Sequence, residues 1–321
     1  MNTPALFELR NPHSILQAIR RRSHAVREVR ISGRHPRGIW EEVVEAAGNA
    51  GIAITSQRSG PPRGRDQRGR NTERQSAGMA RVARPEPADL AEVLGKPKNG
   101  DIVIALDCLQ DPQNVGAVFR SAAFFGTRGV ISTKDKSAPI NATVCDIAAG
   151  GVDSVPFHVA TNLARTLEHA RDAGYWILGS SEHATQSVFV VDDRPWIVVI
   201  GNEQSGMRRL TQENCDEVCR LEPKGRVTSL NAAAATASML TALTRPRVVP
   251  SAWIDARGAV DVLRLTNAVI GLIHDLVEYL AKQALLAAKW CRGLQICGWH
   301  ACCIFKGCRT NRGGIIPNEG T

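Results

Sequence analysis

The sequence predicts an α/β fold with a mainly parallel sheet and helices on both of its faces. Two apolar runs, residues 102–107 and 196–200, have the length and composition of strands that are buried on both sides. Between and after them, strand-like and helical stretches alternate as far as residue 243. This alternation is typical of parallel sheets, because each parallel connection needs a crossover. Ligands in such folds bind at the carboxyl ends of the strands.

The central region is expected to alternate strands and helices from residue 102 onward. Strands are assigned to short apolar runs bounded by turn residues, and helices to longer stretches with a period near 3.6 residues. After the first strand, Asp111-Pro112 turns the chain, and Asn114 stands where the next helix needs an N-cap. The expected order is a strand at 102–107, a helix at 114–125, a strand at 129–132, helices at 141–149 and 161–173, strands at 175–180 and 196–200, a helix at 208–214, a strand at 218–221 and a helix at 231–243.

The first third of the chain reads as a smaller unit with its own helices and strands. We expect helices at 14–21 and 39–50 and strands at 26–31 and 52–55. The next segment, 56–75, has six arginines, two acidic residues and almost no apolar side chain, so it cannot bury enough surface to offset the entropy of ordering. It is therefore a loop or a disordered segment, either an RNA-contacting arm or a long insertion.

The positive charge of the chain is concentrated in this first third. The whole chain has a formal charge of +9, and residues 1–100 contain 18 Lys and Arg against 10 Asp and Glu. A local basic excess fits a partner rich in phosphate, such as a nucleic acid. A solvated basic surface would give the same count.

Length and composition favour a globular intracellular protein of two domains with a tail. The chain has 321 residues, 43% of them hydrophobic, which is enough for two domains. We expect one domain at 1–95, a second at 100–244 and a tail of unknown role at 245–321. The nine cysteines lack the spacing of a disulfide framework, which fits a reducing compartment. We find no signal peptide and no membrane span, so a cytoplasmic location without a membrane partner is expected.

Three loops that follow predicted strands carry unusual residues. In the first, Leu106 to Gly126, Gly116 removes a side chain from the first helical turn, and Arg120 lies among apolar neighbours. A guanidinium in such surroundings needs an anion or acceptors, although a surface arginine on an amphipathic helix is an equal reading. In the second, Val198 to Met207, Gly201 directly follows a buried strand and permits a ligand to approach the backbone closely.

The third loop, Leu221 to Leu240, has Ser229 and Asn231 on either side of Leu230 at the start of an alanine-rich helix. Simple helix capping would also explain Ser and Asn at these positions. The three loops contain neither the dinucleotide fingerprint G-x-G-x-x-G nor a phosphate loop with Lys-Ser or Lys-Thr. A nicotinamide-dependent oxidoreductase is therefore disfavoured.

Together, the three loops resemble the signature motifs of the SpoU-type RNA ribose methyltransferases of the SPOUT superfamily. The chain reads D-x-x-x-D-P-x-N-x-G-A-x-x-R-[ST]-A, then G-N-E-x-x-G, then S-L-N-x-[AS] in this order. The resemblance covers roughly residues 100–244. More loosely, residues 10–95 look like the small substrate-binding domain, similar to ribosomal protein L30e, that precedes the catalytic domain in many members.

The resemblance implies a fold and an activity. The fold would be a SPOUT parallel sheet with a trefoil knot, assembled as a homodimer, and the cofactor would be S-adenosyl-L-methionine. By motif position, Gly201, Leu221 and Leu230 would line the cofactor site, Asn114 and Arg120 would act at the ribose, and Glu203, Ser229 and Asn231 would complete the active site. The substrate would be ribosomal or transfer RNA, with ribosomal RNA favoured. A non-catalytic RNA-binding relative is the alternative, and retention of the polar motif residues argues against it.

The chemistry implied by the resemblance is attack of a ribose 2′-oxygen on the methyl group of a sulfonium. A 2′-hydroxyl is a poor nucleophile at neutral pH, so a positioned group must accept its proton or stabilise the developing alkoxide. Arg120 is the candidate, acting chiefly through its positive charge because guanidinium groups stay protonated. Five of the nine cysteines lie at 291–308, but their spacing does not suit a zinc site. We therefore expect no metal and a tail that is dispensable for catalysis.

Overall fold

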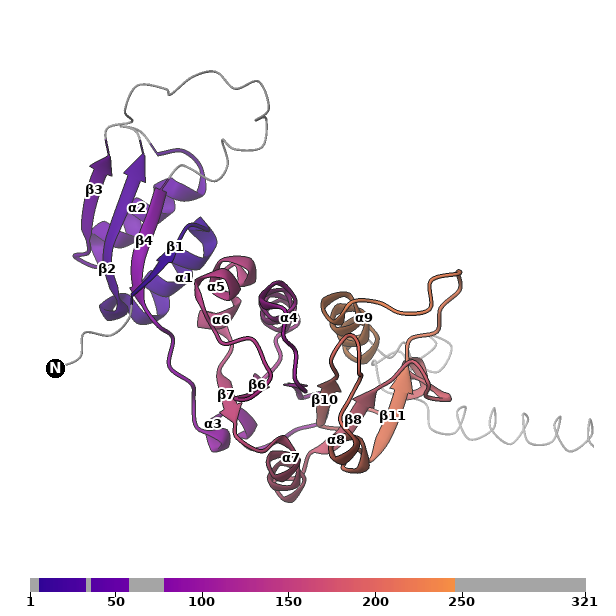
Figure 1. Ribbon diagram of the computed structural model, residues 1–321. Coiled ribbons are helices and arrows are strands. Elements are labelled where there is room, and N and C mark those ends of the chain that lie inside the picture. The colour runs from indigo at the N-terminus through magenta and orange to yellow at the C-terminus, as the bar shows by residue number, and fades with distance from the viewer. Residues whose placement is uncertain (1–5, 33–35, 58–77, 246–321) are drawn as a thin grey trace, which may run out of the picture. The chain divides into compact units, whose positions relative to one another are not determined.

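The structure is a computed structural model that describes residues 6–32, 36–57 and 78–245. Within this part of the chain there are a four-stranded sheet and a seven-stranded sheet (Figure 1). The expected cysteine cluster at 291–308 and nearly all of the arginine-rich segment 56–75 lie outside the described residues.

The four-stranded sheet belongs to the N-terminal part and has the strand order β1-β4-β2-β3. Strand β4 pairs antiparallel with β1 and β2, whereas β2 and β3 are parallel. Asn11 begins the first helix by accepting the backbone N–H of His13 at 2.9 Å, and Pro12 follows it, a residue that suits a first helical turn. The elements are β1 Leu6–Leu9, α1 Pro12–Arg22, η1 Ser23–Ala25, β2 Val26–Ser32, α2 Ile39–Asn49, β3 Ala53–Gln57 and β4 Gly78–Ala83, with α3 Leu90–Leu94 leading to the second sheet.

The seven-stranded sheet is parallel throughout and has the order β7-β6-β5-β10-β8-β11-β9. Its elements are β5 Ile102–Leu106, α4 Pro112–Phe125, β6 Gly129–Thr133, α5 Ala142–Ala148, α6 Gly151–Ser154, β7 Phe157–Ala160, α7 Leu163–Asp172, β8 Trp176–Ser180, β9 Gln186–Ser187, η2 Val188–Val190, β10 Trp196–Ile200, α8 Arg209–Glu213, β11 Glu217–Arg220 and α9 Ala232–Thr244.

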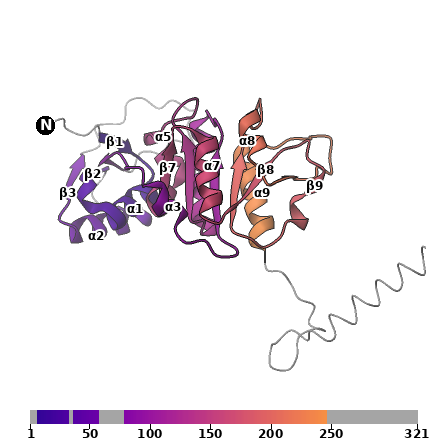
Figure 2. The same ribbon diagram turned by 90° about the horizontal axis from the view of Figure 1, so that it is seen from below.

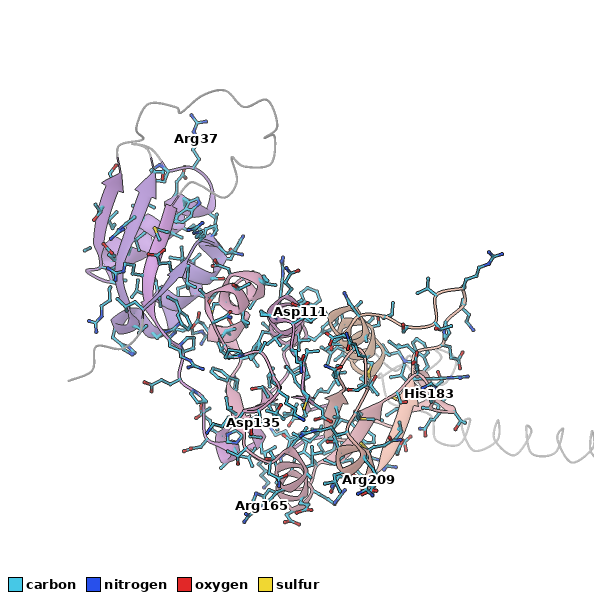
Figure 3. All side chains as sticks on the ribbon, viewed as in Figure 1. Arg37, Asp111, Asp135, Arg165, His183 and Arg209 are labelled. Carbon is cyan, nitrogen blue, oxygen red and sulfur yellow. The ribbon has the colours of Figure 1, made fainter. Side chains whose placement is uncertain are left out.

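Helices cover both faces of this sheet, as the apolar strands predict. In β5, Ile104 and Leu106 pack into the core beneath α4, while Val103 and Ala105 pack with α7 on the other face. Figures 1 and 2 show α4, α5 and α9 on one face and α3, α7 and α8 on the other. Arg165 on α7 and Arg209 on α8 are exposed and project away from the sheet (Figure 3).

The two sheets share one hydrophobic core through helices α1, α5 and α6. A carboxylate at this junction, Asp146, accepts the backbone N–H groups of Arg10 and Asn11 at 3.0 Å, and burial raises its pKa. The hydroxyl of Ser14 donates to the backbone oxygen of Cys145 at 2.6 Å. The domain boundary near residue 95 remains a prediction, because these contacts join residues 6–83 to the larger sheet within one compact unit, Met1–Arg245.

The fold confirms the expected α/β class with a parallel sheet, and nearly all the elements predicted after residue 100. The sequence reading missed β1, β4, β7, β9, α3 and α6, which are short and flanked by polar or helical residues. It also placed the N-cap of α4 wrongly. Asp111 is the N-cap and accepts the N–H of Gln113 at 2.9 Å, because Pro112 takes the first helical position and leaves Asn114 inside the first turn. Among the described residues, none of the helices is long and apolar enough to cross a membrane.

Candidate active site

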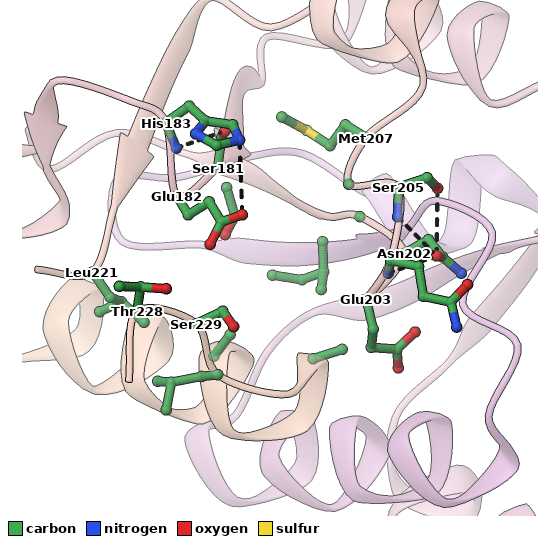
Figure 4. Close-up of a pocket in the computed structure, with 18 of the residues that line it drawn as sticks. Ser181, Glu182, His183, Asn202, Glu203, Ser205, Met207, Leu221, Thr228 and Ser229 are labelled. Carbon is green, nitrogen blue, oxygen red and sulfur yellow. Dashed lines mark hydrogen bonds and ion pairs between the residues drawn. The ribbon is translucent and has the colours of Figure 1, made fainter. Parts of the chain in front are cut away.

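A pocket of about 450 Å³ lies at the carboxyl ends of three adjacent strands (Figure 4). The strands are β10, β8 and β11, which are parallel neighbours, so the loops that follow them meet at one edge of the sheet. Its volume is in the range of small-molecule and cofactor sites. The wall consists of residues 180–183 at the end of β8, 200–207 at the end of β10 and parts of 221–235 after β11, with Gln212 from α8.

The loop after β10 is folded around Asn202. Its side-chain oxygen accepts the N–H groups of Gln204 and Ser205 at 2.9 and 3.2 Å, and its amide donates to the backbone oxygen of Cys108 at 3.0 Å. The backbones of Asn202 and Gly206 exchange two hydrogen bonds of 3.0 and 2.9 Å. The loop is therefore a closed turn that is tied to the loop after β5.

Gly201 lines the pocket, but the reason for a glycine here differs from the one expected. A Cβ on Gly201 would lie 2.4 Å from the backbone carbon of Gly206 and 2.4 Å from the nitrogen of Met207. The close approach that glycine permits is therefore made by the loop's own returning backbone. A role of Gly201 in cofactor binding stays a proposal.

An ion pair between a buried carboxylate and a half-exposed arginine also anchors this loop. Asp107 is fully buried directly after β5, and its carboxylate accepts both the guanidinium Nε of Arg208 at 2.6 Å and the backbone N–H of Arg208 at 2.8 Å. Hydrogen bonds to a charged group are stronger than neutral ones, and this pair joins two strand ends. Asp107 and Arg208 thus fix where the loop 201–207 begins and ends.

Asn114 and Glu203 meet at the edge of the pocket. The side-chain amide of Asn114 on α4 donates to the carboxylate of Glu203 at 2.6 Å, and Glu203 lines the pocket. Gly116, in the same turn, packs against α5, since a Cβ there would lie 2.7 Å from the Cβ of Ile147. The first and second motifs are therefore joined by side chains, and the glycine serves helix packing.

The third loop contributes three of the predicted residues to the pocket. Leu221, Ser229 and Leu230 line it, and Leu230 is 54% exposed. Asn231 does not line the pocket. It is the N-cap of α9 and accepts the N–H of Ala234 at 2.8 Å. Asn231 therefore has the helix-capping role that was the alternative for both residues, whereas Ser229 faces the pocket.

Arg120 lies outside the pocket of its own chain. It is exposed on α4, and its side chain forms neither a hydrogen bond nor an ion pair with the described residues. Six residues separate it from Asn114, which places it about 240° further around the helix and roughly 9 Å along its axis. The structure therefore brings together Asn114, Glu203, Ser229 and the cofactor-loop residues, but not Arg120.

The sequence reading missed the wall after β8, where Ser180, Ser181, Glu182 and His183 line the pocket. The rule that selected the other loops, a turn directly after a buried strand, would also have selected this one, because 175–180 was expected to be a strand. The anchoring roles of Asp107 and Asn202 were also missed.

The described cysteines are not suited to nucleophilic chemistry. Burial raises the pKa of the Cys108 thiol, and it raises the pKa values of Cys215 and Cys219 to about 12. Such thiols stay protonated at neutral pH, and only the thiolate is a good nucleophile. Among the described residues, groups of His, Cys, Asp and Glu that could hold a metal ion are also absent.

Comparison with known proteins identifies the family. Residues 101–241 match the SpoU rRNA Methylase family. A 23S rRNA (guanosine-2′-O-)-methyltransferase from Bordetella pertussis is 32% identical over 239 residues, which are 73% of this chain and 95% of that protein. The chain belongs to the SpoU rRNA methylase family. A second relative with the same description, from Pseudomonas aeruginosa, is 42% identical over 159 residues, 49% of this chain and 64% of that protein.

A solved structure shares the fold. The SpoU methyltransferase AviRb from Streptomyces viridochromogenes, crystallised with S-adenosylmethionine, aligns with a TM-score of 0.58 and 22% identity, over 74% of this chain and 89% of that one. Membership of the SpoU family confirms the family predicted from the three motifs and, with it, the class of activity, methylation of RNA.

Proposed function

We propose that this SpoU family member transfers a methyl group from S-adenosylmethionine to the ribose 2′-oxygen of a guanosine in 23S ribosomal RNA. The observation that carries the proposal is the pocket at the carboxyl edge of the sheet, where Glu203, bonded to Asn114 at 2.6 Å, stands beside the loop of Ser229. The choice of guanosine in 23S rRNA as the target rests on the similar proteins from Bordetella pertussis and Pseudomonas aeruginosa. Both are described as 23S rRNA (guanosine-2′-O-)-methyltransferases.

The lining of the pocket fits S-adenosylmethionine. Apolar side chains of Leu221, Val227 and Leu230 offer a surface for an adenine ring, and the backbone at Gly201 lies at the end of β10. The carboxylates of Glu182, Glu203 and Glu222 make the whole pocket acidic, which suits a ligand that carries a positive sulfonium charge. When bound, the cofactor supplies an electrophilic methyl group. The described residues therefore provide both the shape and the charge for it.

Within this proposal, the polar residues position the ribose and stabilise its 2′-oxygen during transfer. The amide of Asn114 holds the Glu203 carboxylate in place, and Ser229 on the opposite loop supplies a hydroxyl that donates or accepts a hydrogen bond. Asn231 acts by fixing the start of α9, which positions the loop before it. Arg120 stabilises the alkoxide that develops when the 2′-hydroxyl loses its proton.

The proposed role of Arg120 requires a second copy of the chain. Since Arg120 does not line its own pocket, a homodimer that brings α4 of one protomer to the pocket of its partner would supply it. Exposed apolar side chains support such an interface. Phe124 on α4 is 82% exposed, and Val227, on the pocket loop, is 76% exposed.

The finer features of the fold are also proposals. Helix α9 follows β11 yet packs against α4, which follows β5, so the chain returns across β8 and β10. This return supports a trefoil knot in which the cofactor loops are held. The basic N-terminal part, with its own sheet and helices, is proposed as an L30e-like RNA-binding domain. A cytoplasmic location follows from ribosomal RNA as the substrate.

Transfer of a radioactive methyl group tests the proposed substrate class. The full chain should label 23S ribosomal RNA prepared without its native modifications, and should label 16S ribosomal RNA and bulk transfer RNA at least about tenfold less. Equal labelling of transfer RNA, or labelling of transfer RNA alone, would contradict ribosomal RNA as the substrate.

A further inference from the structure

The wall after β8 contains an acidic residue that the three motifs do not explain. Glu182 lines the pocket two residues after the end of β8, and its side chain is 50% exposed. The backbone before it is fixed, since the N–H of Ser181 donates to the oxygen of Cys219 at 3.0 Å. The N–H of His183, which follows, donates to the hydroxyl of Ser181 at 3.2 Å. Hydrogen bonds on both sides of Glu182 therefore fix the turn that carries this acidic side chain at the pocket wall.

The carboxylate of Glu182 is the least engaged of the three acids in the pocket wall. Glu203 accepts a hydrogen bond of 2.6 Å from Asn114, and Glu222 accepts one of 3.4 Å from Lys224. Among the described residues, the carboxylate of Glu182 approaches the ring of His183 at 3.7 Å, which is too long for a hydrogen bond. With respect to the described residues, both of its oxygens are thus free to accept hydrogen bonds from a ligand.

The position of Glu182 decides which part of the ligand it meets. In Figure 4, Glu182 is drawn on the same side of the pocket as Leu221 and Thr228, and Glu203 and Asn202 are drawn on the other side. Glu203 marks the reacting end, so Glu182 is remote from the methyl group. Leu221 belongs to the apolar surface that suits adenine, and the group covalently next to adenine in S-adenosylmethionine is its ribose.

We propose that Glu182 binds the ribose hydroxyls of S-adenosylmethionine and thereby selects a ribonucleoside cofactor. A carboxylate has two oxygens and accepts from both hydroxyls of a cis-diol at once. An acid close to the end of a parallel strand has the same task in dinucleotide-binding folds. The inference rests on the proposed function, since it takes the pocket as the cofactor site.

The test is calorimetry on the full chain with three ligands. These are S-adenosylhomocysteine, its 2′-deoxyribose analogue, and 5′-methylthioadenosine, which keeps the diol but lacks the amino-acid part. In Glu182→Ala and Glu182→Gln, affinity for S-adenosylhomocysteine and for methylthioadenosine should fall by a similar factor, about tenfold or more. The native chain should bind the deoxy analogue more weakly than S-adenosylhomocysteine, and the variants should discriminate much less between them. Glu213→Ala on α8, outside the pocket wall, is the matched control and should bind all three as the native chain does.

The outcomes separate the inference from the proposed function. Unchanged binding in both Glu182 variants, with the native chain binding S-adenosylhomocysteine, overturns the inference alone. A loss with S-adenosylhomocysteine that disappears with methylthioadenosine also overturns it, because the carboxylate would then hold the ammonium group. If the native chain bound none of the three ligands, the proposed function would fail and the inference with it.

Discussion

At the scale of single residues, the least expected feature is the place of Arg120. The sequence allowed either an anion-binding arginine or a surface arginine, and the structure puts the side chain on the exposed face of α4, outside the pocket. An exposed arginine on α4 can still bind an anion if it reaches the pocket of a partner protomer. The proposed role of Arg120 at the ribose therefore requires a dimer.

Arg120→Ala is expected to abolish methyl transfer while leaving affinity for S-adenosylmethionine within a few fold, because Arg120 does not line the pocket. Arg120→Lys should fail as well, since an ammonium does not reproduce the planar fork of a guanidinium. Single-turnover transfer and calorimetry measure the two effects separately. Native turnover in the alanine variant would rule out the proposed role.

Gly201→Ala should weaken cofactor binding by more than about tenfold, because the new methyl group would lie 2.4 Å from the backbone of Gly206 and Met207 and force the loop to move. Gly225→Ala is the matched control, as a Cβ there has open space around it. Calorimetry with S-adenosylmethionine should show the control within about twofold of the native chain. Equal affinities for all three proteins would show that this loop does not form the site.

At the scale of elements, the loop after β10 depends on contacts that are distant in the sequence. The buried Asp107 and the half-exposed Arg208 are 101 residues apart, and Asn202 binds the backbone of Cys108, 94 residues away. Such pairs join the first and second motifs into one structure. A change that breaks them should therefore affect the stability of the protein as well as the pocket.

Substitutions of two adjacent arginines measure how much the Asp107–Arg208 pair contributes to the free energy of unfolding. Arg208→Ala leaves the buried Asp107 carboxylate with one backbone donor and should lower the free energy of unfolding by about 1–3 kcal/mol. Arg209→Ala removes an exposed pair with Glu213 and should change it by less than about 0.5 kcal/mol. Urea unfolding of both variants gives the comparison. A smaller loss for Arg208→Ala than for Arg209→Ala would contradict the anchoring role.

The sequence predicted the elements of the large sheet well, because its buried strands are continuous apolar runs such as Trp196–Ile200. It predicted poorly the short strands, such as β7 and β9, whose four and two residues carry too little pattern. Of the site residues predicted from the three motifs, Gly201, Glu203, Leu221, Ser229 and Leu230 line the pocket. Their geometry could not be predicted, since the contact of Asn114 with Glu203 joins positions 89 residues apart, and the wall at Glu182 lies outside every motif.

At the scale of the whole molecule, residues 6–245 contain both sheets and the entire pocket wall among the described residues. The family match ends at residue 241, shortly before the tail begins. We therefore keep the prediction that residues 246–321 are dispensable for the proposed activity.

A chain that ends at Arg245 is expected to methylate RNA at a rate within about twofold of the full chain and to contain no less metal. Its unfolding midpoint should also be similar, because Met1–Arg245 is a compact unit. Elemental analysis and transfer assays on both proteins provide the check. Stoichiometric zinc in the full chain that is lost together with activity on truncation would show that the tail has a catalytic role.

The pocket is proposed to direct a methyl group to a ribose oxygen of RNA. The most direct measurement is mass spectrometry of nucleosides from 23S ribosomal RNA after reaction with the full chain and S-adenosylmethionine carrying a deuterated methyl group. We expect the label in 2′-O-methylguanosine at a single position, and no label after reaction with Arg120→Ala. Label on a base, or a labelled ribose that the Arg120 variant forms equally well, would contradict the account.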